Sequence, residues 1–468
     1  MADDDRRVMV LANRLPVRRS NGDWATSPGG LVSALTPIVR ERTGLWIGWT
    51  GEPDEAVEPF EHDGIGMRPV TISRSEIDDH YLGFCNSTVW PLFHDAVRTP
   101  EFHRHWWRAY RAVNERFADA AVSELRDGDL VWVNDYQLLL APAMIREVAA
   151  GDGLHIGFFL HIPFPPVEIF ARLPWRTQIV EGLLGADVVA FQTERSAANF
   201  ADAVERFTDA VVGRGRVAYH GRRVRIEARP IAIDTGRFEQ LRRDSVTEAH
   251  IERLRAELGD PSTVVLGVDR LDYTKGIDVR LRAFETLLER HADIAGDTVF
   301  MQIAVPSREA IVDYEEMRER VEGLVGRING SYGGPHHMPV HYVYGGVPPE
   351  ELVAYYALAD VMAVTPLADG MNLVAKEYVA CRAEDDGVLV LSEFAGASDE
   401  LEMALLVNPY DLDGVAAVLG RAISMPEGEQ AERMSVLREV VRRHDVHRWA
   451  RECLGSIAAP DGFDGGVR

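Results

Sequence analysis

The chain has 468 residues, of which 46% are hydrophobic and 26% are charged, and its formal net charge is −24. This length exceeds what one hydrophobic core normally supports and predicts two domains of about 200 residues each. The acidic balance argues against nucleic acid or an anionic membrane as a partner, and no apolar run approaches the roughly 20 residues that span a bilayer. The opening MADDDRR leads into a strand-like segment rather than a signal-peptide core, so we expect a cytoplasmic protein.

The three cysteines, Cys85, Cys381 and Cys453, are an odd number and lie far apart in the sequence. This spacing fits neither a disulfide framework nor a zinc site, so we expect buried thiols. The net negative charge also means that an anionic substrate needs locally concentrated cations, which gives weight to arginine and lysine residues inside motifs.

Apolar segments alternate with amphipathic segments along the whole chain, which is typical of βαβ units. The pattern predicts strands at 8–12, 45–49, 130–133, 156–160, 188–192, 264–268, 298–304, 341–344, 361–365 and 387–391. It predicts the longer helices at 100–125, 178–184, 245–258, 278–290, 308–329, 349–358 and 413–423. The fold class is therefore α/β, with parallel sheets covered on both faces and ligands bound beyond the carboxyl ends of the strands.

A domain boundary is predicted near residues 230–243, where the apolar run PIAID gives way to a polar, charge-dense helix. We assign residues 1–235 to an amino-terminal domain and residues 236–445 to a second domain. Residues 446–468 form a helix and a tail, and we expect this helix to pack back toward the first domain. Two similar α/β domains that face each other would leave a cleft.

Polar residues follow the predicted strands of the first half. Arg14 comes directly after the opening strand, and Gly29 and Gly30 precede a helix. Tyr81 and Trp90 lie in the polar stretch HYLGFCNSTVWPLFH, which we interpret as rich in turns. Aromatic rings in such a stretch can line a sugar-phosphate pocket, although ordinary core packing is the alternative for each of them.

Two further polar residues close adjacent predicted strands. Asp135 ends a buried strand in VNDYQLLLAP, and His161 ends the next one in FFLHIPFPP. Either residue alone is often structural. Because the carboxyl ends of neighbouring parallel strands meet at one sheet edge, the pair suggests one shared site.

In the second half, the segment GVDRLDYTKGI follows a predicted strand and places Arg270 and Lys275 at its carboxyl end. Gly276 opens the next helix, and the two cations are suited to hold a leaving diphosphate. The alternative is a surface loop of ion pairs, in which the aspartates neutralise their neighbours. Arg308 is a third cation at the same edge, and its alternative is a surface arginine that opens a helix.

The segment ADGMNLVAKEYVAC, residues 368–381, is the most informative of the chain. A strand runs through a short loop directly into a helix, whose first N–H groups lack intrahelical partners and favour a diphosphate. Gly370 permits a close approach of the ligand. Glu377 lies on the inner face of this helix, where a ribose diol would satisfy its carboxylate. The alternative is an ordinary strand–loop–helix with a solvated Lys376–Glu377 pair.

Together these segments resemble the trehalose-6-phosphate synthase family, retaining glycosyltransferases with two facing Rossmann-like domains, the GT-B architecture. The resemblance extends from about Val8 to Trp449 and rests on motifs in the same order. They are NRLP, SPGGL, WIGW, HYLGFCNSTVWP, DYQL, GFFLHIPFP, FQTE, DRLDYTKG, PSR, GRING, DGMNLVAKEYVA, LSEFAGA and VNPYD. The resemblance implies transfer of glucose from a nucleoside diphosphate glucose to glucose 6-phosphate, in the cleft between the domains, giving α,α-trehalose 6-phosphate. UDP-glucose is the expected donor, with GDP-glucose as the alternative.

The resemblance also implies roles on the donor side. Arg270 and Lys275 would hold the diphosphate, and Glu377 the ribose. His161 would contact the donor glucose near the reacting centre. The donor glucose and phosphates would further be held by Asp369, Gly370, Met371, Asn372, Leu373 and Val374, and we add Gly30 to the donor side.

On the acceptor side, Asp135 would bind a hydroxyl of the acceptor sugar. The pocket for the acceptor phosphate would contain Arg14, Tyr81, Trp90 and Arg308, with Trp46 nearby. The residues that we expect to act in catalysis are Asp135, His161, Arg270, Lys275 and Asp369. One departure is Asn134, where many relatives have histidine before the Asp-Tyr pair. Since the aspartate is kept, this departure concerns the residues behind the site. Val347, near the expected nucleobase pocket, varies among relatives and does not settle the base.

For the mechanism we favour front-face internal return, which the family is thought to use. The departing phosphate oxygen would take the acceptor's proton on the same face of an oxocarbenium-like glucose, and no protein nucleophile is required. We expect no metal and no cofactor, because cationic side chains fill that role, and we expect a homo-oligomer, a dimer or a tetramer. Three alternatives remain. They are a C–N coupling pseudo-glycosyltransferase of the same fold, a non-catalytic sugar-phosphate sensor, and a glycogen- or sucrose-synthase-like transferase, which would not explain the aromatic residues on the acceptor side.

Overall fold

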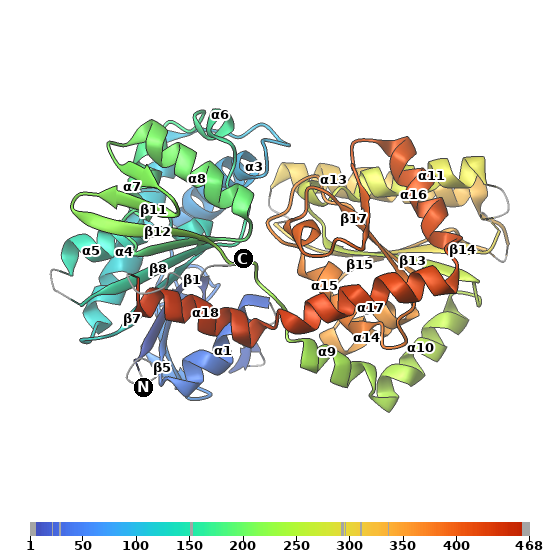
Figure 1. Cartoon of the computed structure of the whole chain (residues 1–468), viewed down its shortest axis with the longest axis horizontal. Coiled ribbons are helices and arrows are strands. Elements are labelled where there is room, and N and C mark those ends of the chain that lie inside the picture. Colours follow the sequence, from blue (N-terminus) through green and yellow to red (C-terminus); the bar gives the residue numbers. More distant parts are fainter. Residues whose placement is uncertain are drawn as a thin grey trace. The chain divides into compact units, whose positions relative to one another are not determined.

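The computed structural model describes residues 6–20, 22–27, 30–149, 153–291, 294, 296–308, 311–335 and 337–460. The chain divides into two compact units (Figure 1). The first unit comprises Met1–Ile231 and His447–Arg468, and the second comprises Ala232–Val446. The chain therefore first passes from one unit to the other between Ile231 and Ala232, within the segment 230–243 where the sequence predicts a boundary.

The first unit is built on a sheet of ten strands within the described residues, in the order β10-β11-β12-β9-β8-β7-β1-β4-β6-β5. Their bounds are β1 Val8–Arg14, β4 Leu45–Trp49, β5 Phe60–His62, β6 Ile65–Pro69, β7 Leu130–Asn134, β8 His155–Leu160, β9 Val188–Phe191, β10 Val211–Gly213, β11 Arg216–Tyr219 and β12 Arg222–Ala228. A separate hairpin pairs β2 (Val17–Ser20) with β3 (Asp23–Thr26).

The centre of this sheet is parallel, as predicted, but both of its edges are antiparallel. At one edge β10 returns into β11 through a two-residue turn, in which Gly215 has a φ of +63°. Such turns require positive φ values and join strands too short to carry a hydrophobic period. The expectation of a wholly parallel first sheet was therefore wrong at its edges.

Helices cover both faces of the first sheet. They are α1 Gly30–Glu41, α2 Arg74–Glu76, α3 Trp90–Phe93, α4 Arg104–Glu124, α5 Ala141–Val148, α6 Val167–Phe170, α7 Arg176–Leu183, α8 Glu194–Phe207 and α18 Val446–Ala458, with a short 3-10 turn η2 at Tyr136–Leu138. In α18, Trp449 packs on Trp132 and Phe159, with ring centroids 5.5 and 5.1 Å apart. Gly157 of β8 leaves room for this helix, because a Cβ there would lie 2.3 Å from the side chain of Ile457.

The stretch around Tyr81 is not rich in turns but forms a π-helix, η1, over Ile77–Val89. Asn86 and Ser87 donate side-chain hydrogen bonds to carbonyls five residues earlier, at 2.7 and 2.9 Å. These bonds support the wide helical turn, a geometry that often occurs at functional sites. Seven of its residues are buried, which explains why its polar composition misled the sequence interpretation.

The second unit contains a six-stranded sheet in which all pairs are parallel, in the order β15-β14-β13-β16-β17-β18. The strands are β13 Thr263–Arg270, β14 Thr298–Val305, β15 Val340–Tyr344, β16 Val361–Val364, β17 Val388–Ser392 and β18 Leu405–Val407. The helices are α9 Thr235–Arg242, α10 Ser245–Glu257, α11 Ile277–Arg290, α13 Val312–Tyr332, α14 Pro349–Leu358, α15 Leu373–Cys381, α16 Leu412–Ile423 and α17 Glu427–Arg443, with 3-10 turns η3 Tyr273–Lys275 and η4 Gly396–Asp399.

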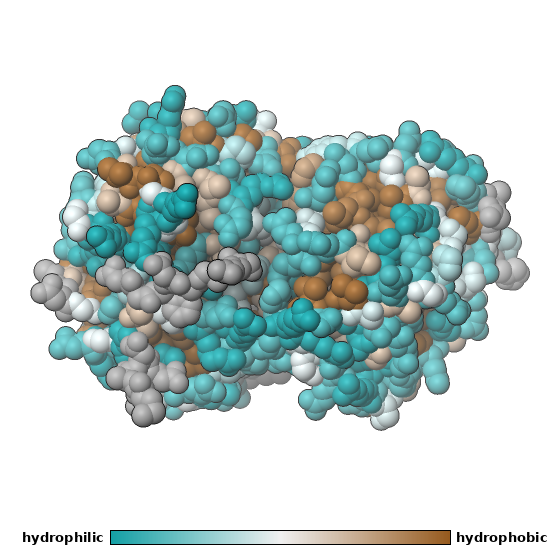
Figure 2. Space-filling view, in the orientation of Figure 1, coloured by the Kyte–Doolittle hydropathy of each residue, from teal (hydrophilic) through white to brown (hydrophobic). Residues whose placement is uncertain are grey.

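This second sheet lies between two helical layers, α11, α13 and α16 on one face and α9, α10, α14 and α15 on the other (Figure 1). The predicted α/β class with two Rossmann-like units is therefore confirmed. The three cysteines are buried free thiols, as predicted. None of the described helices is long and apolar enough to cross a bilayer. The face of the molecule drawn in Figure 2 is mainly hydrophilic.

Candidate functional site

In the second unit, the predicted donor residues gather at the carboxyl edge of the sheet. Strand β13 ends at Arg270, and η3 follows it and ends at Lys275. The ammonium of Lys275 lies 2.5 Å from Oδ2 of Asp369, which follows β16. Gly276 then precedes α11 as its N-cap with a φ of +61°, and a Cβ there would lie 2.6 Å from the carbonyl oxygen of Thr365. This crowding explains a glycine directly after the lysine.

Asp272 connects the predicted cations of this loop. It is fully buried and accepts hydrogen bonds from Arg308 at 2.9 Å, from the Tyr314 hydroxyl at 3.0 Å, and from the N–H and hydroxyl of Thr274 at 3.0 and 2.9 Å. Burial alone would raise the pKa of Asp272, but Arg308 and Arg270 outweigh it and lower the pKa to about 2. The alternative, a surface loop of ion pairs, is therefore wrong for Asp272 in that this residue is buried, although the aspartate does pair with a neighbouring cation as that alternative expects.

Arg308 itself adopts a φ of +48° and its side chain is 5% exposed. The alternative of an exposed, helix-opening arginine is thus also wrong. Sequence reasoning missed Tyr314 on α13, which contacts both Arg308 and Asp272. It also missed Arg280, a fully buried residue 2.8 Å from Asp269 that also donates to the carbonyl of Lys275.

The helix α15 begins as the sequence predicts, but its first turn is partly capped. Asn372 adopts a φ of +80°, and its side-chain oxygen accepts the N–H of Ala375 at 3.2 Å. Its amide nitrogen donates to Asp369 at 3.1 Å. Among the described residues, the backbone N–H groups of Leu373 and Val374 have no hydrogen-bond acceptor. Two helical donors therefore remain for an anion, together with the helix dipole.

The loop before α15, Gly370 and Met371, is held from the side by η4. The N–H of Ala397 donates to the carbonyl of Met371 at 2.8 Å, and Gly396 donates to the carbonyl of Asp369 at 3.2 Å. Asp369 also bridges to Ala395 in parallel register. The predicted phosphate loop is thus fixed by backbone bonds on the side that faces β17.

Glu377 lies one turn further along α15 and points inward. Its Oε2 accepts a hydrogen bond from the hydroxyl of Tyr356 at 2.7 Å, and burial raises the pKa of this carboxyl. Its neighbour Lys376 is 2% exposed and lies 2.5 Å from Glu400. The alternative of a solvated Lys376–Glu377 pair is therefore wrong.

In the first unit, a cationic and aromatic cluster lies around the end of β1. The guanidinium of Arg14 lies 4.1 Å above the ring of Trp49, and the ring of Tyr81 lies 6.3 Å from the same indole. Gly51 permits this arrangement, since a Cβ there would lie 2.0 Å from Arg14. Trp46 is 1% exposed, and its indole N–H donates to the carbonyl of Arg14 at 3.0 Å.

Sequence reasoning selected Trp46 from this cluster and missed Trp49. The position of Trp49 at the end of its strand could have indicated it, because Trp49 is the last residue of β4 and β4 pairs with β1. Trp90 is 4% exposed and packs against His94 and Tyr136, at 4.2 and 5.6 Å. Gly30 begins α1, and Gly29 lies outside the described residues.

Asp135 and His161 do meet, as the neighbouring strand ends predict. Asp135 adopts a φ of +72°, and its Oδ1 accepts the backbone N–H of His161 at 3.3 Å. Burial lowers the pKa of the His161 ring to about 3. Asn134, the departure noted in the sequence, lies directly behind this pair, with Oδ1 3.3 Å from Nε2 of His161.

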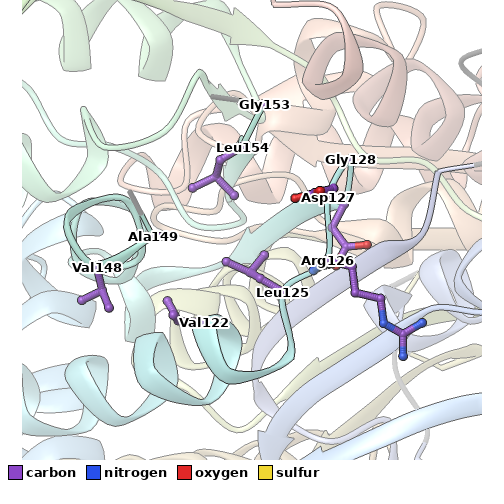
Figure 3. Close-up of a pocket in the computed structure, with 10 residues that line it drawn as sticks. Val122, Leu125, Arg126, Asp127, Gly128, Val148, Ala149, Gly153 and Leu154 are labelled. Carbon is purple, nitrogen blue, oxygen red and sulfur yellow. Dashed lines mark hydrogen bonds between the residues drawn. The ribbon is translucent and has the colours of Figure 1, made fainter. Parts of the chain in front are cut away.

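A pocket of about 340 Å³ lies elsewhere in the first unit, at the amino end of β7. Its lining includes the turn Arg126–Gly128 and the apolar residues Val122, Leu125, Val148 and Leu154 (Figure 3). Asp129 at its edge pairs with Arg7 at 2.5 Å. Because Asp135 and His161 lie at the opposite, carboxyl end of the strands, this pocket is separate from the predicted site.

Comparison with known proteins gives a consistent result. Residues 6–459 match the model of glycosyltransferase family 20. The trehalose-6-phosphate synthase of Mycolicibacterium gilvum is 49% identical over 96% of this chain and 93% of the relative, and that of Mycolicibacterium smegmatis is 49% identical over 96% and 92%.

Solved structures agree with these relatives. An Escherichia coli protein bound with UDP-2-fluoro glucose superposes with a TM-score of 0.90, at 35% identity over 97% of this chain and 99% of the other. A UDP-forming alpha,alpha-trehalose-phosphate synthase from Burkholderia xenovorans, in complex with glucose-6-phosphate, superposes with a TM-score of 0.89, at 34% identity over 97% and 99%.

Proposed function

The chain belongs to glycosyltransferase family 20 and is a glycosyltransferase with trehalose-6-phosphate synthase activity, and from this premise we propose that it uses UDP-glucose and retains the anomeric configuration. The product is then α,α-trehalose 6-phosphate. We propose further that the donor binds to the second unit and the acceptor to the first.

The observation that carries the donor side is the cluster at the carboxyl edge of the second sheet. Lys275 contacts Asp369 just before α15, where two backbone N–H groups remain for an anion, and Arg270 ends strand β13. A cation about 4 Å from a phosphate oxygen contributes roughly 4 kcal/mol at an effective dielectric near 20. This positive charge favours departure of the diphosphate, and Glu377 offers its second oxygen to the ribose.

The acceptor side is supported by the cluster of Arg14, Trp49 and Tyr81, which combines a cation with aromatic faces. Such a combination suits a phosphorylated hexose, and Arg308 of the second unit would supply another cation. The carboxylate of Asp135, which accepts the backbone N–H of His161, would also accept a hydrogen bond from a hydroxyl of the acceptor sugar. UDP-2-fluoro glucose and glucose-6-phosphate in the E. coli and B. xenovorans structures support these two substrate classes.

We propose front-face internal return as the mechanism. The diphosphate leaves, the oxocarbenium-like glucose is held in place, and the departing phosphate oxygen accepts the proton of the acceptor hydroxyl as the new C–O bond forms. The protein orients the two substrates and stabilises the negative charge of the leaving group. No step requires a protein nucleophile, a metal or a cofactor.

The test is turnover of glucose 6-phosphate with UDP-, GDP- and ADP-glucose in parallel, followed by NMR of the product. We expect the highest kcat/KM with UDP-glucose, and two anomeric protons with the small coupling of α linkages. A β linkage at the unphosphorylated glucose, which comes from the donor, would contradict retention. Preference for another nucleotide would contradict the donor assignment alone.

A further inference from the structure

Both ring nitrogens of His161 contact side-chain amides from the neighbouring strands. Asn134, the last residue of β7, places Oδ1 3.3 Å from Nε2 of the ring. Gln192, directly after β9, places its amide nitrogen 3.5 Å from Nδ1. Since β7, β8 and β9 are adjacent in the sheet, the imidazole lies between two amides at the same sheet edge.

The orientation of the Asn134 amide is fixed by the backbone. Its Nδ2 lies 3.1 Å from the carbonyl oxygen of Trp132 and 3.5 Å from that of Leu11. Carbonyl oxygens only accept hydrogen bonds, so the amide nitrogen must face them. The amide oxygen therefore faces Nε2 of His161, and this ring nitrogen must carry a proton to donate.

The Gln192 amide is fixed in the opposite sense. Its oxygen accepts the backbone N–H of Ile231 at 2.9 Å, and a backbone N–H only donates. The amide nitrogen therefore faces Nδ1 of His161 and presents a donor to it. For this contact to be a hydrogen bond, Nδ1 must hold a lone pair rather than a proton.

The remaining surroundings do not favour an imidazolium. The rings of Phe159 and Trp449 lie 4.6 and 6.4 Å from the imidazole. Among the described residues, the ionisable side chain in contact with His161 is Asp135, and its carboxylate accepts the backbone N–H rather than a ring N–H. Burial lowers the pKa of His161 to about 3, which agrees with this geometry.

We propose that Asn134 and Gln192 are positioning residues that hold His161 as a neutral imidazole with its proton on Nε2. The catalytic consequence rests on the proposed function, in which this ring contacts the donor glucose. Positive charge develops on that glucose as the diphosphate leaves, so an imidazolium would repel it. The amide pair keeps the ring uncharged and excludes it as a proton carrier.

The test begins with the wild-type protein, and a variant is used only to assign the signals. Long-range ¹H–¹⁵N correlation spectra of protein labelled at its 15 histidines report which ring nitrogen is protonated. The His161 signals are assigned by their loss in His161→Asn. We expect the Nε2–H tautomer, unchanged from pH 5.5 to 8. A proton on Nδ1, or an imidazolium within this range, would overturn the proposal.

The variant Gln192→Glu tests the role of the amide directly. A glutamate keeps the acceptor for the Ile231 N–H but presents an acceptor, not a donor, to Nδ1. We expect both ring nitrogens of His161 to become protonated at pH 7. Gln178→Glu, an exposed residue of α7 in the same unit, is the charge-matched control and should leave the spectrum of His161 unchanged.

Kinetics then separate the positioning role from a structural one. In Gln192→Glu we expect kcat to fall about tenfold or more at pH 7, with KM for both substrates nearly unchanged and a new ionisation in the pH profile. An imidazolium with unchanged kcat would overturn the positioning role. The NMR readout needs no turnover, so failure of the proposed donor or of retention would leave the tautomer result standing.

Discussion

The ammonium of Lys275 lies 2.5 Å from Oδ2 of Asp369, a contact between residues 94 positions apart. Strands β13 and β16 are neighbours in the parallel sheet, so the segments that follow them meet at one edge. Asn372 donates to the same carboxylate oxygen and also caps α15. The lysine is therefore held at the amino end of the helix that we propose binds the diphosphate.

Removal of this lysine should impair transfer more than folding. For Lys275→Ala we expect kcat/KM for the nucleotide sugar to fall by about 100-fold or more, the usual effect of losing one preorganised group at a developing negative charge. Steady-state kinetics with varied donor measure this change. A loss of less than about tenfold, or roughly 1.4 kcal/mol, would show that Lys275 does not stabilise the leaving group.

Arg290→Ala provides a matched control for that variant. Arg290 ends α11 in the same unit and pairs with Asp413 at the exposed surface, with an N···O distance of 2.5 Å. An exposed pair of this kind contributes roughly 0–1 kcal/mol to stability. We expect turnover by this variant to equal that of the wild type.

Arg308 should act on the phosphorylated acceptor. Arg308→Ala is expected to raise KM for glucose 6-phosphate by about tenfold or more, because one cation near the phosphate is lost. The KM for the nucleotide sugar should change little. The opposite pattern would assign Arg308 to the donor.

Because Arg308 also pairs with buried Asp272, its removal leaves a buried carboxylate without its main partner. Arg308→Lys is therefore measured alongside Arg308→Ala, since a lysine keeps the charge but not the planar guanidinium. Thermal unfolding of both variants separates a loss of stability from a loss of acceptor binding. Arg318→Ala, which breaks an exposed pair with Glu322 on α13, is the control.

Gly276 should tolerate no side chain. Gly276→Ala places a Cβ in a backbone with φ of +61° and 2.6 Å from the carbonyl oxygen of Thr365. We expect a loss of stability of about 1–3 kcal/mol from strain, measured by urea unfolding. Gly259→Ala is the matched control, because its φ is +83° and its Cβ would meet nothing within 4 Å. Equal losses for the two variants would show that crowding by Thr365 contributes nothing.

His80 should make the protein sensitive to acid. Burial lowers its pKa to about 3 in the folded chain, against 6.5 for an unperturbed histidine. Between these two values the unfolded state binds a proton that the folded state does not, so stability falls as the pH is lowered from 6.5. The slope is at most about 1.4 kcal/mol per pH unit for one such group.

The measurement is the free energy of unfolding as a function of pH in wild type and in His80→Gln. We expect a shallower acid slope in the variant, because glutamine does not titrate. His103→Gln, at a side chain that is 43% exposed, should keep the wild-type slope. An unchanged slope in His80→Gln would mean that the buried ring does not govern acid unfolding.

The sequence predicted those parts of the fold that carry a clear period. Strand β4 and helix α14 have the predicted limits, and the loops after β13 and β16 hold the predicted cations and the phosphate-binding turn. These segments are predictable because buried parallel strands read as continuous apolar runs. The π-helix η1 was not predictable, since its side-chain bonds to carbonyls five residues earlier follow no hydrophobic period.

Contacts between segments that are distant in the sequence were also not predictable. The contact between Trp49 and Arg14 results from the pairing of β1 with β4. The burial of Lys376 depends on its ion pair with Glu400, which lies in a different loop. Likewise, the sequence indicated only that Asn134 departs from the family pattern behind the site. Its contact with His161 results from the pairing of β7 with β8. Each of these depends on strand order, which a single sequence does not specify.

The order of the units along the chain has a practical consequence. The second unit, Ala232–Val446, is one uninterrupted stretch, and the parallel bridge from Ile233 to Asp445 brings the ends of that stretch together. A gene fragment for this unit alone therefore encodes a polypeptide with closely spaced termini, as domain insertion requires. The first unit can be encoded only by fusing its two pieces, and a stop codon after Asp445 would uncover Trp132 and Phe159.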